Sequence, residues 1–333
     1  MRKLNVAIVG ATGMVGRTFL KVLAERNFPI EELYLLSSSK SAGTKINYCG
    51  KEYTVEELTE DSFTGRDIHI ALFSAGGSIS AKFAPIARDN GILVIDNSSQ
   101  WRMDPDVPLV VPEVNPEDIK KHKGIIANPN CSTIQAMVPL KSLDKKYGIK
   151  RIVYSTYQAV SGSGVKGVED LEKGMEGNPT GFYPHQISYN CLPHIDVFLE
   201  NGYTKEEMKM VNETMKILNN YDLKITATTV RVPVKNGHSE CINVEFKNEF
   251  ELSDLVQTLK DTEGIIVQDE PEKNIYPTAV ETAGTDEVYV GRIRRDFSVD
   301  NGVNLWVVAD NIRKGAATNA VQIAEKAIEI GLF

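Results

Sequence analysis

Apolar residues in the first 130 positions come in short continuous runs that alternate with amphipathic segments. Four runs have the length and β-branched content of strands buried on both faces: residues 4–9, 33–36, 68–74 and 92–96. Residues 14–25 and 78–90 lie between these runs and have the apolar spacing of helices. This alternation of strand and helix predicts an α/β domain built on a parallel sheet.

The pattern changes after about residue 149, where the runs become longer and apolar residues alternate with polar ones. Five runs follow this pattern: residues 149–160, 223–234, 238–246, 288–294 and 305–308. The turn residues Lys235-Asn236-Gly237 and Asn301-Gly302 suggest that the last four runs form two hairpins. We therefore expect an α+β domain with a mostly antiparallel sheet.

Two further segments have helical periodicity. Residues 204–219 have an apolar stripe made of Met208, Val211, Met215 and Leu218. Residues 313–330 form a final helix that we expect to return and cover the first domain. The predicted domains are residues 1–128, completed by 312–333, and residues 129–311.

Gly10, Gly13 and Gly16 stand between the first predicted strand and the first predicted helix. A glycine turn at a helix N-terminus presents bare N–H groups to a pyrophosphate. The spacing G-x-x-G-x-x-G differs from the common dinucleotide fingerprint. Its place at the first strand–helix junction nevertheless indicates a Rossmann-type dinucleotide-binding domain.

The residues after the second predicted strand bear on which dinucleotide binds. NAD sites usually place Asp or Glu there to hold the ribose hydroxyls, but this chain has Ser37-Ser38-Ser39-Lys40-Ser41. Hydroxyl groups with one cation suit a 2′-phosphate, so the sequence favours NADP. The alternative is a solvated loop.

Residues 125–137 read as a short strand, a turn and the start of a helix. Asn130 suits the N-cap, which puts Cys131 at the first helical position. The free N–H groups and the positive end of the helix dipole favour a thiolate there, which is the nucleophilic form of cysteine. The alternative is a small buried cysteine. Pro139 lies inside the same pattern and is expected to kink or break the helix.

Other candidates are recognised by position alone. Arg102 follows the carboxyl end of a predicted strand, where ligands of open α/β sheets bind. Glu206 and Lys209 share one face of a predicted helix, where a surface ion pair is the default interpretation. Arg231 and His238 bracket the first predicted hairpin. A lone histidine is more often structural, but an arginine on the partner strand makes a functional pair more suggestive.

The composition narrows the class of protein. The chain has 333 residues and a net charge of −8, which fit two domains and disfavour nucleic acid and anionic membranes as partners. It has four cysteines: Cys49, Cys131, Cys191 and Cys241. They are too few for a disulfide scaffold, and Cys191 with His194 is only a weak metal-binding pair, so we expect no metal and reduced thiols in a cytoplasm. No run has the length of a membrane span, and the start Arg2-Lys3 reads better as the approach to a strand than as a signal peptide.

Five motifs occur in order along nearly the whole chain. They are Gly10-Ala11-Thr12-Gly13-Met14-Val15-Gly16, Pro129-Asn130-Cys131-Ser132-Thr133, Gln158 with Ser161-Gly162, Arg231-Val232-Pro233-Val234 with Gly237-His238-Ser239-Glu240, and Asp310-Asn311. Together they closely resemble aspartate-semialdehyde dehydrogenase. The cysteine motif and the Arg231/His238 segment are the most specific parts of the resemblance.

The resemblance implies NADPH-dependent reduction of β-aspartyl phosphate to aspartate semialdehyde with release of phosphate, a step towards lysine, diaminopimelate, threonine, methionine and isoleucine. It implies a homodimer or a dimer of dimers. The implied site roles are as follows: Cys131 forms an acyl-thioester, His238 is the acid/base, Gln158 orients the substrate, Arg231 binds the α-carboxylate, Glu206 the amino group, and Arg102 with Lys209 the phosphate. The residues implied to contact the cofactor are Gly10, Thr12, Gly13, Met14, Val15, Lys40, Ser41, Ser161, Gly162 and Asn311. Lys40 stands where many members carry Arg, and lysine meets a phosphate only as a point charge.

The chemistry fits these residues independently, because a thiolate, a nearby proton donor and a nicotinamide cofactor are what reduction of an acyl phosphate requires. The nearest alternative is N-acetyl-γ-glutamyl-phosphate reductase. Its substrate is acetylated and has no free amino group for an acid such as Glu206 to bind. A cysteine hydrolase would have no use for the glycine loop or Lys40. A non-catalytic NADP-binding regulator would not need Cys131.

Overall fold

The computed structural model describes residues 3–333. Met1, at the start of the predicted first domain, and Arg2, of the pair Arg2-Lys3, lie outside the described residues. The chain divides into two compact units, one formed by Met1–Pro129 with Ala316–Phe333 and the other by Asn130–Gly315. The predicted boundaries at 128/129 and 311/312 lie one and four residues from these divisions. No helix within residues 3–333 has the length and apolar character needed to cross a membrane.

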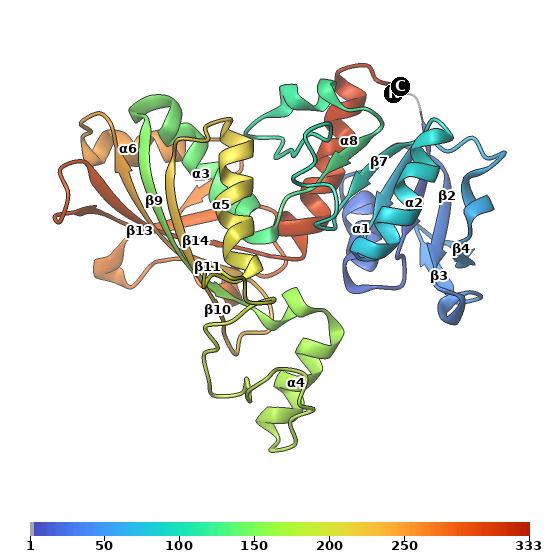
Figure 1. Ribbon diagram of the computed structural model, residues 1–333, viewed down its shortest axis with the longest axis horizontal. Helices are drawn as coiled ribbons and strands as arrows, with labels where there is room; N and C mark the ends of the chain where they lie inside the picture. The colour runs from blue at the N-terminus through green and yellow to red at the C-terminus, as the bar shows by residue number, and fades with distance from the viewer. Residues whose placement is uncertain (1–2) are drawn as a thin grey trace. The chain divides into compact units, whose positions relative to one another are not determined.

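The first unit is built on a six-stranded sheet in which every neighbouring pair is parallel, with strand order β5-β2-β1-β6-β7-β8. The strands are β1 Leu4–Val9, β2 Ile30–Ser37, β5 Glu56–Glu57, β6 Ile70–Phe73, β7 Leu93–Asp96 and β8 Ile125–Ala127. The helices are α1 Met14–Glu25, α2 Gly77–Asp89 and α8 Asn319–Glu329, and a small hairpin pairs β3 Lys45–Tyr48 with β4 Lys51–Thr54. This is the Rossmann-type α/β sheet that the alternating runs predicted (Figure 1).

Helix α8 belongs to the first unit although it comes last in the chain. Its residues Val321 and Ile323 join the buried cluster that contains Phe19 and Leu23 of α1 and Ile8 of β1. The predicted single helix from residue 313 is instead two segments. Arg313–Thr318 is a π-helical turn, and the α-helix begins at Asn319.

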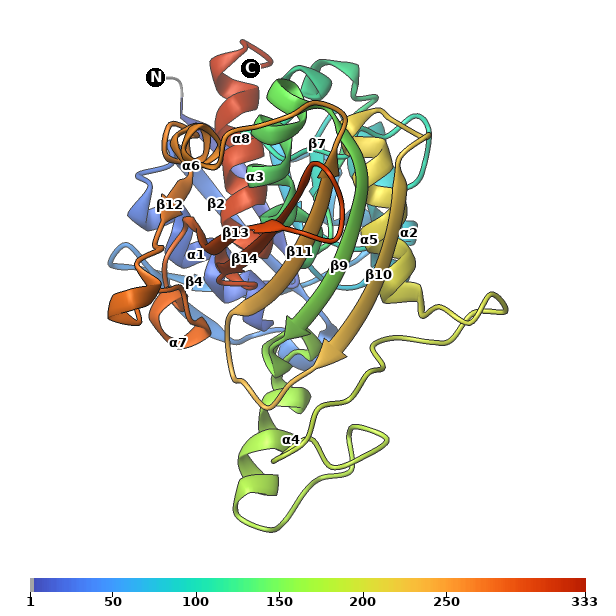
Figure 2. The ribbon, with the colours of Figure 1, turned by 90° about the vertical axis from the view of Figure 1, so that its left-hand side faces the viewer.

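The second unit is a mixed six-stranded sheet with strand order β10-β9-β11-β14-β13-β12. Its strands are β9 Ile149–Gln158, β10 Lys224–Arg231, β11 His238–Phe246, β12 Ile265–Val267, β13 Val288–Asp296 and β14 Gly302–Ala309. The three inner pairs are antiparallel, as predicted, and the two outer pairs are parallel. The helices of this unit are α3 Cys131–Tyr147, α4 Val165–Met175, α5 Lys205–Leu218, α6 Leu252–Lys260 and α7 Ala279–Thr282. Figure 2 shows α3 and α5 on one side of the sheet and the other side of β9, β10 and β11 open, whereas the segment around α7 packs against β14.

The hairpin predicted between residues 223–234 and 238–246 does not form. Strand β9 lies between β10 and β11, parallel to the first and antiparallel to the second. The intervening segment pairs with the chain after β9 instead, since Val160 N donates to Val234 O and Ser161 N to Lys235 O. The predicted turn is therefore a crossover around the end of β9. The second predicted hairpin, of β13 and β14, is confirmed.

Two helices differ from their sequence patterns. Helix α3 runs through Pro139 without a break, because every residue from Ser132 to Leu140 is buried and tertiary packing outweighs one lost N–H. On α5, Met208 and Met215 are only partly buried, whereas Glu206 and Glu213 are buried. The buried face of α5 is thus rotated from the predicted stripe toward acidic residues, which the apolar pattern could not indicate.

Candidate active site

Cys131 is the first residue of α3, as predicted, and its side chain is partly buried. The N-cap prediction is confirmed, because Asn130 Oδ1 accepts from the N–H groups of Ser132 at 3.0 Å and Thr133 at 3.4 Å. A cysteine at this end of a helix is favoured as the thiolate. Gly315 leaves room for it, since a Cβ at that position would lie 2.9 Å from Cys131 Cβ.

A buried carboxylate, Glu206, holds the residues around Cys131 in place. Its Oε1 accepts from Asn130 Nδ2 at 2.9 Å and from Gln158 Nε2 at 3.0 Å. Its Oε2 accepts from Lys209 Nζ at 2.9 Å. Burial alone would raise the pKa of Glu206, but the Lys209 charge and these hydrogen bonds outweigh it and lower the pKa to about 2. Glu206 is therefore ionised, and one carboxylate organises three candidate residues.

Lys209 lies between two carboxylates, Glu206 and Asp196, with Nζ 2.8 Å from Asp196 Oδ2. Burial would lower its pKa, but the two carboxylates outweigh burial and the pKa of Lys209 is raised. The default interpretation of Glu206 and Lys209 as a surface ion pair is wrong, because Glu206 is only 5% exposed. The pair is a charged, mostly buried part of the site.

His238 and Arg231 meet at Ala159, although they lie on strands that do not pair. The Ala159 N–H donates to His238 Nδ1 at 3.0 Å, and Arg231 Nη1 donates to Ala159 O at 2.6 Å. A Cβ on Gly162 would lie 3.0 Å from Arg231 Nη1 and 3.3 Å from His238 Cε1. Gly162, expected at the cofactor, therefore also leaves space for these two side chains.

His238 is fully buried. Burial and the nearby Arg231 charge lower its pKa to about 3, against a weaker opposing effect of Glu206. From α3, Gln135 donates to the main-chain oxygen of His238 at 3.2 Å. This bond connects the second turn of the Cys131 helix to the start of β11.

Ser161 and Asn311, two expected cofactor contacts, are buried and bonded to each other. Asn311 Nδ2 donates to Ser161 Oγ at 2.9 Å, and Asn311 Oδ1 accepts from Gly237 N at 2.9 Å. Gly237 directly precedes His238. Asn311 thus also supports the main chain that carries the histidine.

Arg102, in the first unit, is 7% exposed and is not a surface solubilising residue. Its Nε donates to Asn128 O at 2.9 Å and its Nη2 to Asn97 O at 3.0 Å. Both carbonyls follow strands of the parallel sheet, β8 and β7. The guanidinium is therefore held at the carboxyl end of that sheet, where the sequence placed it.

The glycine loop of the first unit has the geometry of a dinucleotide cradle. Gly10 has a φ of +89°, and a Cβ there would lie 2.4 Å from Ser74 O. A cavity of about 310 Å³ opens beside the loop, lined by Gly10, Thr12, Gly13, Ser37, Ser38, Ser74 and neighbouring apolar residues. The helix α1 begins here with Met14 and Val15, and its N-cap, Gly13, makes no side-chain capping bond. A phosphate-bearing ligand fits these bare N–H groups.

The hydroxyl cluster after β2 joins the same cradle. Thr12 Oγ1 lies 2.9 Å from Ser37 Oγ and 3.2 Å from Ser41 Oγ. Lys40 is exposed beside them in a short 3₁₀ turn, Ser39–Ser41. A cation and several hydroxyls are therefore available at the position where the sequence predicted a 2′-phosphate.

Sequence reasoning missed several residues of this site. Glu213 accepts from the Asn130 N–H at 2.7 Å, and it lies two helical turns after Glu206 on the same face of α5. That spacing of two acids was a readable signal. No sequence pattern indicated that Asp196 or the main-chain N–H of Ala159 belongs to the site.

No metal site is formed within residues 3–333, where no three His, Cys, Asp or Glu side chains are grouped to hold an ion. His194 stacks on Phe198 with ring centroids 4.3 Å apart, and Cys191 is exposed. All four cysteines lie in the described part of the chain, and none of them is in a disulfide there.

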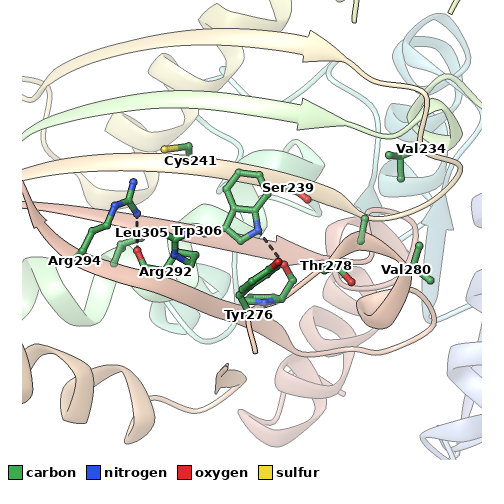
Figure 3. A pocket seen from close by; sticks show the side chains of 12 residues that line it. Val234, Ser239, Cys241, Tyr276, Thr278, Val280, Arg292, Arg294, Leu305 and Trp306 are labelled. Carbon is green, nitrogen blue, oxygen red and sulfur yellow. Dashed lines mark hydrogen bonds between the residues drawn. The ribbon is translucent and has the colours of Figure 1, made fainter. Parts of the chain in front are cut away.

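A second cavity, of about 580 Å³, lies on the other side of the second sheet (Figure 3). Ser239 and Cys241 line it together with Tyr276, Arg294 and Trp306. Because side chains alternate along a strand, Ser239 and Cys241 of β11 point away from the face that carries His238 and Glu240. This cavity is therefore separate from the cluster around Cys131.

The comparisons with known proteins point to one family over nearly the whole chain. Residues 5–122 match the family model "Semialdehyde dehydrogenase, NAD binding domain", and residues 140–314 match "Semialdehyde dehydrogenase, dimerisation domain". The chain is 59% identical over 339 residues to aspartate-semialdehyde dehydrogenase of Aquifex aeolicus, covering 99% of both chains. Among solved structures it is similar to aspartate semialdehyde dehydrogenase II of Vibrio cholerae complexed with ASA, with a TM-score of 0.94, 50% identity and 99% of each chain covered. It is also similar to the Candida albicans enzyme with NADP, with a TM-score of 0.80, 26% identity and both chains covered completely.

Proposed function

Since the chain belongs to the aspartate-semialdehyde dehydrogenase family, we propose that it reduces β-aspartyl phosphate to aspartate semialdehyde with NADPH and releases phosphate. The observation that supports this most directly is the arrangement around Cys131. A thiol at a helix N-terminus shares its unit with a buried neutral histidine and with a carboxylate that holds Asn130, Gln158 and Lys209.

Cys131 is the nucleophile of this proposal. Its thiolate attacks the acyl carbon, a C–S bond forms, and the negative charge moves to the former carbonyl oxygen. When that adduct collapses, the bond from carbon to the phosphate oxygen breaks and a thioester remains on Cys131. NADPH supplies the hydride that reduces the thioester. Collapse of the second adduct breaks the C–S bond, which releases the aldehyde and returns the thiolate.

The substrate has a carboxylate, an ammonium group and a phosphate, and the second unit offers a partner for each. Arg231 presents a planar guanidinium that matches a carboxylate. Glu206 is ionised and can accept from the ammonium group, and Lys209 remains a cation for the phosphate. Gln158, bonded to Glu206, orients the substrate. Arg102 of the first unit completes the phosphate assignment in this proposal.

NADP is the proposed cofactor because the first unit offers a cation and hydroxyls where an NAD site usually has an acid. Gly10, Thr12, Gly13, Met14 and Val15 would face the pyrophosphate, and Lys40 with Ser41 the 2′-phosphate. In the second unit Ser161, Gly162 and Asn311 are the proposed contacts.

The test is phosphate-dependent reduction of NADP with aspartate semialdehyde as the second substrate. We expect turnover only when phosphate is present, and little with N-acetyl-glutamate semialdehyde, which lacks the free amino group. A cysteine hydrolase or an NADP-binding regulator would give no phosphate-dependent NADPH. Absence of turnover with all substrates supplied contradicts the proposal.

The substrate assignment is tested by measuring KM for phosphate and for semialdehyde separately. Arg231→Lys keeps the charge but loses the fork, so KM for the semialdehyde should rise by about tenfold. Lys209→Leu and Arg102→Leu should raise KM for phosphate instead. If Arg231→Lys affected only phosphate, the pocket would be oriented the opposite way.

The open face of the second sheet is the proposed dimer interface. The family model for this region is a dimerisation domain. Tyr157 and Trp306, with ring centroids 5.5 Å apart, lie on that face, and Tyr157 is 38% exposed. Tyr157→Glu should convert dimers to monomers in light scattering, whereas Tyr221→Glu, at an exposed position after α5, should not.

Because none of the four cysteines is in a disulfide, we also propose that the enzyme works in the cytoplasm.

A further inference from the structure

Asp196 contacts Lys209 from a segment that precedes α5. Its Oδ2 lies 2.8 Å from Lys209 Nζ, and its Oδ1 accepts from the N–H of Val197 at 2.9 Å. The side chain of Asp196 is 32% exposed and that of Lys209 is 18% exposed. The pair is therefore mostly shielded from water, where an ionic contact constrains a side chain more strongly than it does on an open surface.

The main chain around Asp196 is anchored on both sides. Before it, Leu192 and Arg231 exchange two main-chain hydrogen bonds, each of 2.8 Å. After it, the carbonyl of Val197 accepts from the N–H of Lys205, the first residue of α5, at 2.8 Å. Asp196 has a φ of +67°, a left-handed conformation that aspartate and asparagine adopt more readily than most residues. The carboxylate thus reaches Lys209 from a main chain that is fixed in place.

The ammonium group of Lys209 has three N–H donors. In the described part of the chain two of them are used, by Glu206 Oε2 at 2.9 Å and by Asp196 Oδ2 at 2.8 Å. Because the three N–H bonds are tetrahedral, two fixed acceptors determine the direction of the third. Glu206 alone would leave the group free to rotate about one contact.

The charges in this group support one another. Burial lowers the pKa of Lys209, but Glu206 and Asp196 together outweigh burial and raise it. Burial raises the pKa of Asp196, but the hydrogen bond and charge of Lys209, with a smaller effect of the Lys205 charge, lower it. Both carboxylates and the ammonium group are therefore ionised near neutral pH. Asp196 helps to keep Lys209 a cation although the lysine is largely buried.

We propose that Asp196 is a positioning residue for phosphate, which with Glu206 holds the Lys209 ammonium group so that its third N–H is directed at a phosphate oxygen. This role rests on the proposed function, in which Lys209 binds phosphate. Lysine has a flexible four-carbon side chain, and ordering it in advance lowers the entropic cost of binding a ligand. Because Asp196 acts through Lys209, it affects phosphate, whereas Glu206 also serves the substrate ammonium group.

Glycine and asparagine form a matched pair of substitutions at position 196, because both tolerate a left-handed main chain. Asp196→Gly removes the acceptor and the charge, whereas Asp196→Asn keeps an amide oxygen and removes only the charge. Asp222→Asn, at an exposed position after α5, is the control.

The first measurement is KM for phosphate and for aspartate semialdehyde, taken separately. Asp196→Gly should raise KM for phosphate about tenfold and change KM for the semialdehyde less than about twofold, because one charge-assisted contact of Lys209 is lost. The control should leave both values unchanged. An unchanged KM for phosphate in Asp196→Gly, or an equal rise in both KM values, overturns the proposal.

A double-mutant cycle separates positioning from a general structural role. If Asp196 acts only through Lys209, adding Asp196→Gly to Lys209→Leu should cause no further rise in KM for phosphate. Effects that multiply overturn the proposal and leave the proposed function intact. If Lys209→Leu by itself left KM for phosphate unchanged, the phosphate assignment of the proposed function would fail, and the role of Asp196 with it.

The pH dependence is a readout that a loss of packing would not move. Glu206 and Asp196 are the carboxylates that face Lys209, and Lys205 is the further cation that acts on Asp196. Removing the Asp196 charge lowers the pKa of Lys209, and a lysine loses its charge as the pH rises through its pKa. In a series from about pH 8 to about pH 10, KM for phosphate should begin to rise at a lower pH in Asp196→Asn than in wild type or Asp222→Asn. Identical profiles for the three proteins overturn the proposal.

Discussion

The dinucleotide cradle of the first unit and the cluster around Cys131 in the second unit are built in opposite ways. The cradle is organised around the turn from Gly10 to Gly16, whose geometry is a property of the main chain, and residues at the ends of β2 and β6 complete its lining. The cluster draws one or two side chains from each of α3, β9, α5, β10 and β11.

The difference shows what each site depends on. At the glycine turn of the cradle, the critical requirement is the absence of a Cβ, since a Cβ at Gly10 would lie 2.4 Å from Ser74 O. In the cluster, the buried carboxylate of Glu206 satisfies Asn130, Gln158 and Lys209 together. Loss of that one charge should affect all three, because a partly satisfied buried network is costly.

The largest expected effect is in the cluster. Cys131→Ser should lower kcat by roughly 10⁴-fold or more, because a neutral hydroxyl replaces a thiolate nucleophile. NADP affinity, measured by calorimetry, should stay the same, which separates the two sites. Cys49→Ser, at an exposed hairpin position, is the control. Persistent turnover in Cys131→Ser would mean that the nucleophile is elsewhere.

The cradle should respond to a single methyl group. Gly10→Ala adds a Cβ that would lie 2.4 Å from Ser74 O at a φ of +89°, so the turn must move and NADP binding should weaken at least about tenfold. Gly43→Ala is a matched control, because Gly43 has a φ of +85° and nothing lies within 4 Å of the added Cβ. We expect it to lose about 1–3 kcal/mol of stability from backbone strain but no cofactor affinity. Equal NADP affinities in the two variants would argue against close approach at Gly10.

Glu206→Gln tests the network of the cluster. It should lower the free energy of unfolding at pH 7 by about 1.5–3 kcal/mol and raise KM for aspartate semialdehyde, because three hydrogen bonds lose their charged acceptor. Glu207→Gln is the control. That neighbour caps α5 through Thr204 N and should lose stability without a change in KM. A normal KM in Glu206→Gln would remove Glu206 from the substrate site.

The same variant has a pH signature. The pKa of Glu206 is lowered from 4.5 to about 2, so its contribution to stability is complete above pH 4.5 and is lost as the pH falls toward 2. The difference in unfolding free energy between wild type and Glu206→Gln should therefore shrink over that window. A difference that stays constant from pH 5 to pH 2 would contradict the lowered pKa.

The smallest expected effect is at the exposed edge of the cradle. Lys40→Glu should shift the ratio of NADP to NAD efficiency by about tenfold, because it replaces an attraction for the 2′-phosphate with a repulsion. Lys45→Glu, an exposed position on the neighbouring hairpin, serves as the control. An unchanged ratio would place the 2′-phosphate away from Lys40.

The sequence by itself determined the local features of this protein. Helix α1 begins and ends where the apolar pattern predicted, Asn130 caps the Cys131 helix, and Gly10 adopts the conformation that the glycine turn required. Each of these depends on residues close together in the chain, through main-chain conformation, capping bonds and periodic burial. A pattern within one segment is sufficient to reveal them.

Tertiary structure decided which distant residues meet. Arg231 and His238 are brought together at Ala159 because β9 inserts between their strands, whereas the turn residues predicted a hairpin. Pro139 stays within a continuous helix, and Glu206 is buried on a face whose pattern suggested a surface ion pair. In each case the long-range packing and hydrogen bonds of a buried site outweigh a local preference of about 1–3 kcal/mol, and no local pattern in the sequence encodes those partners.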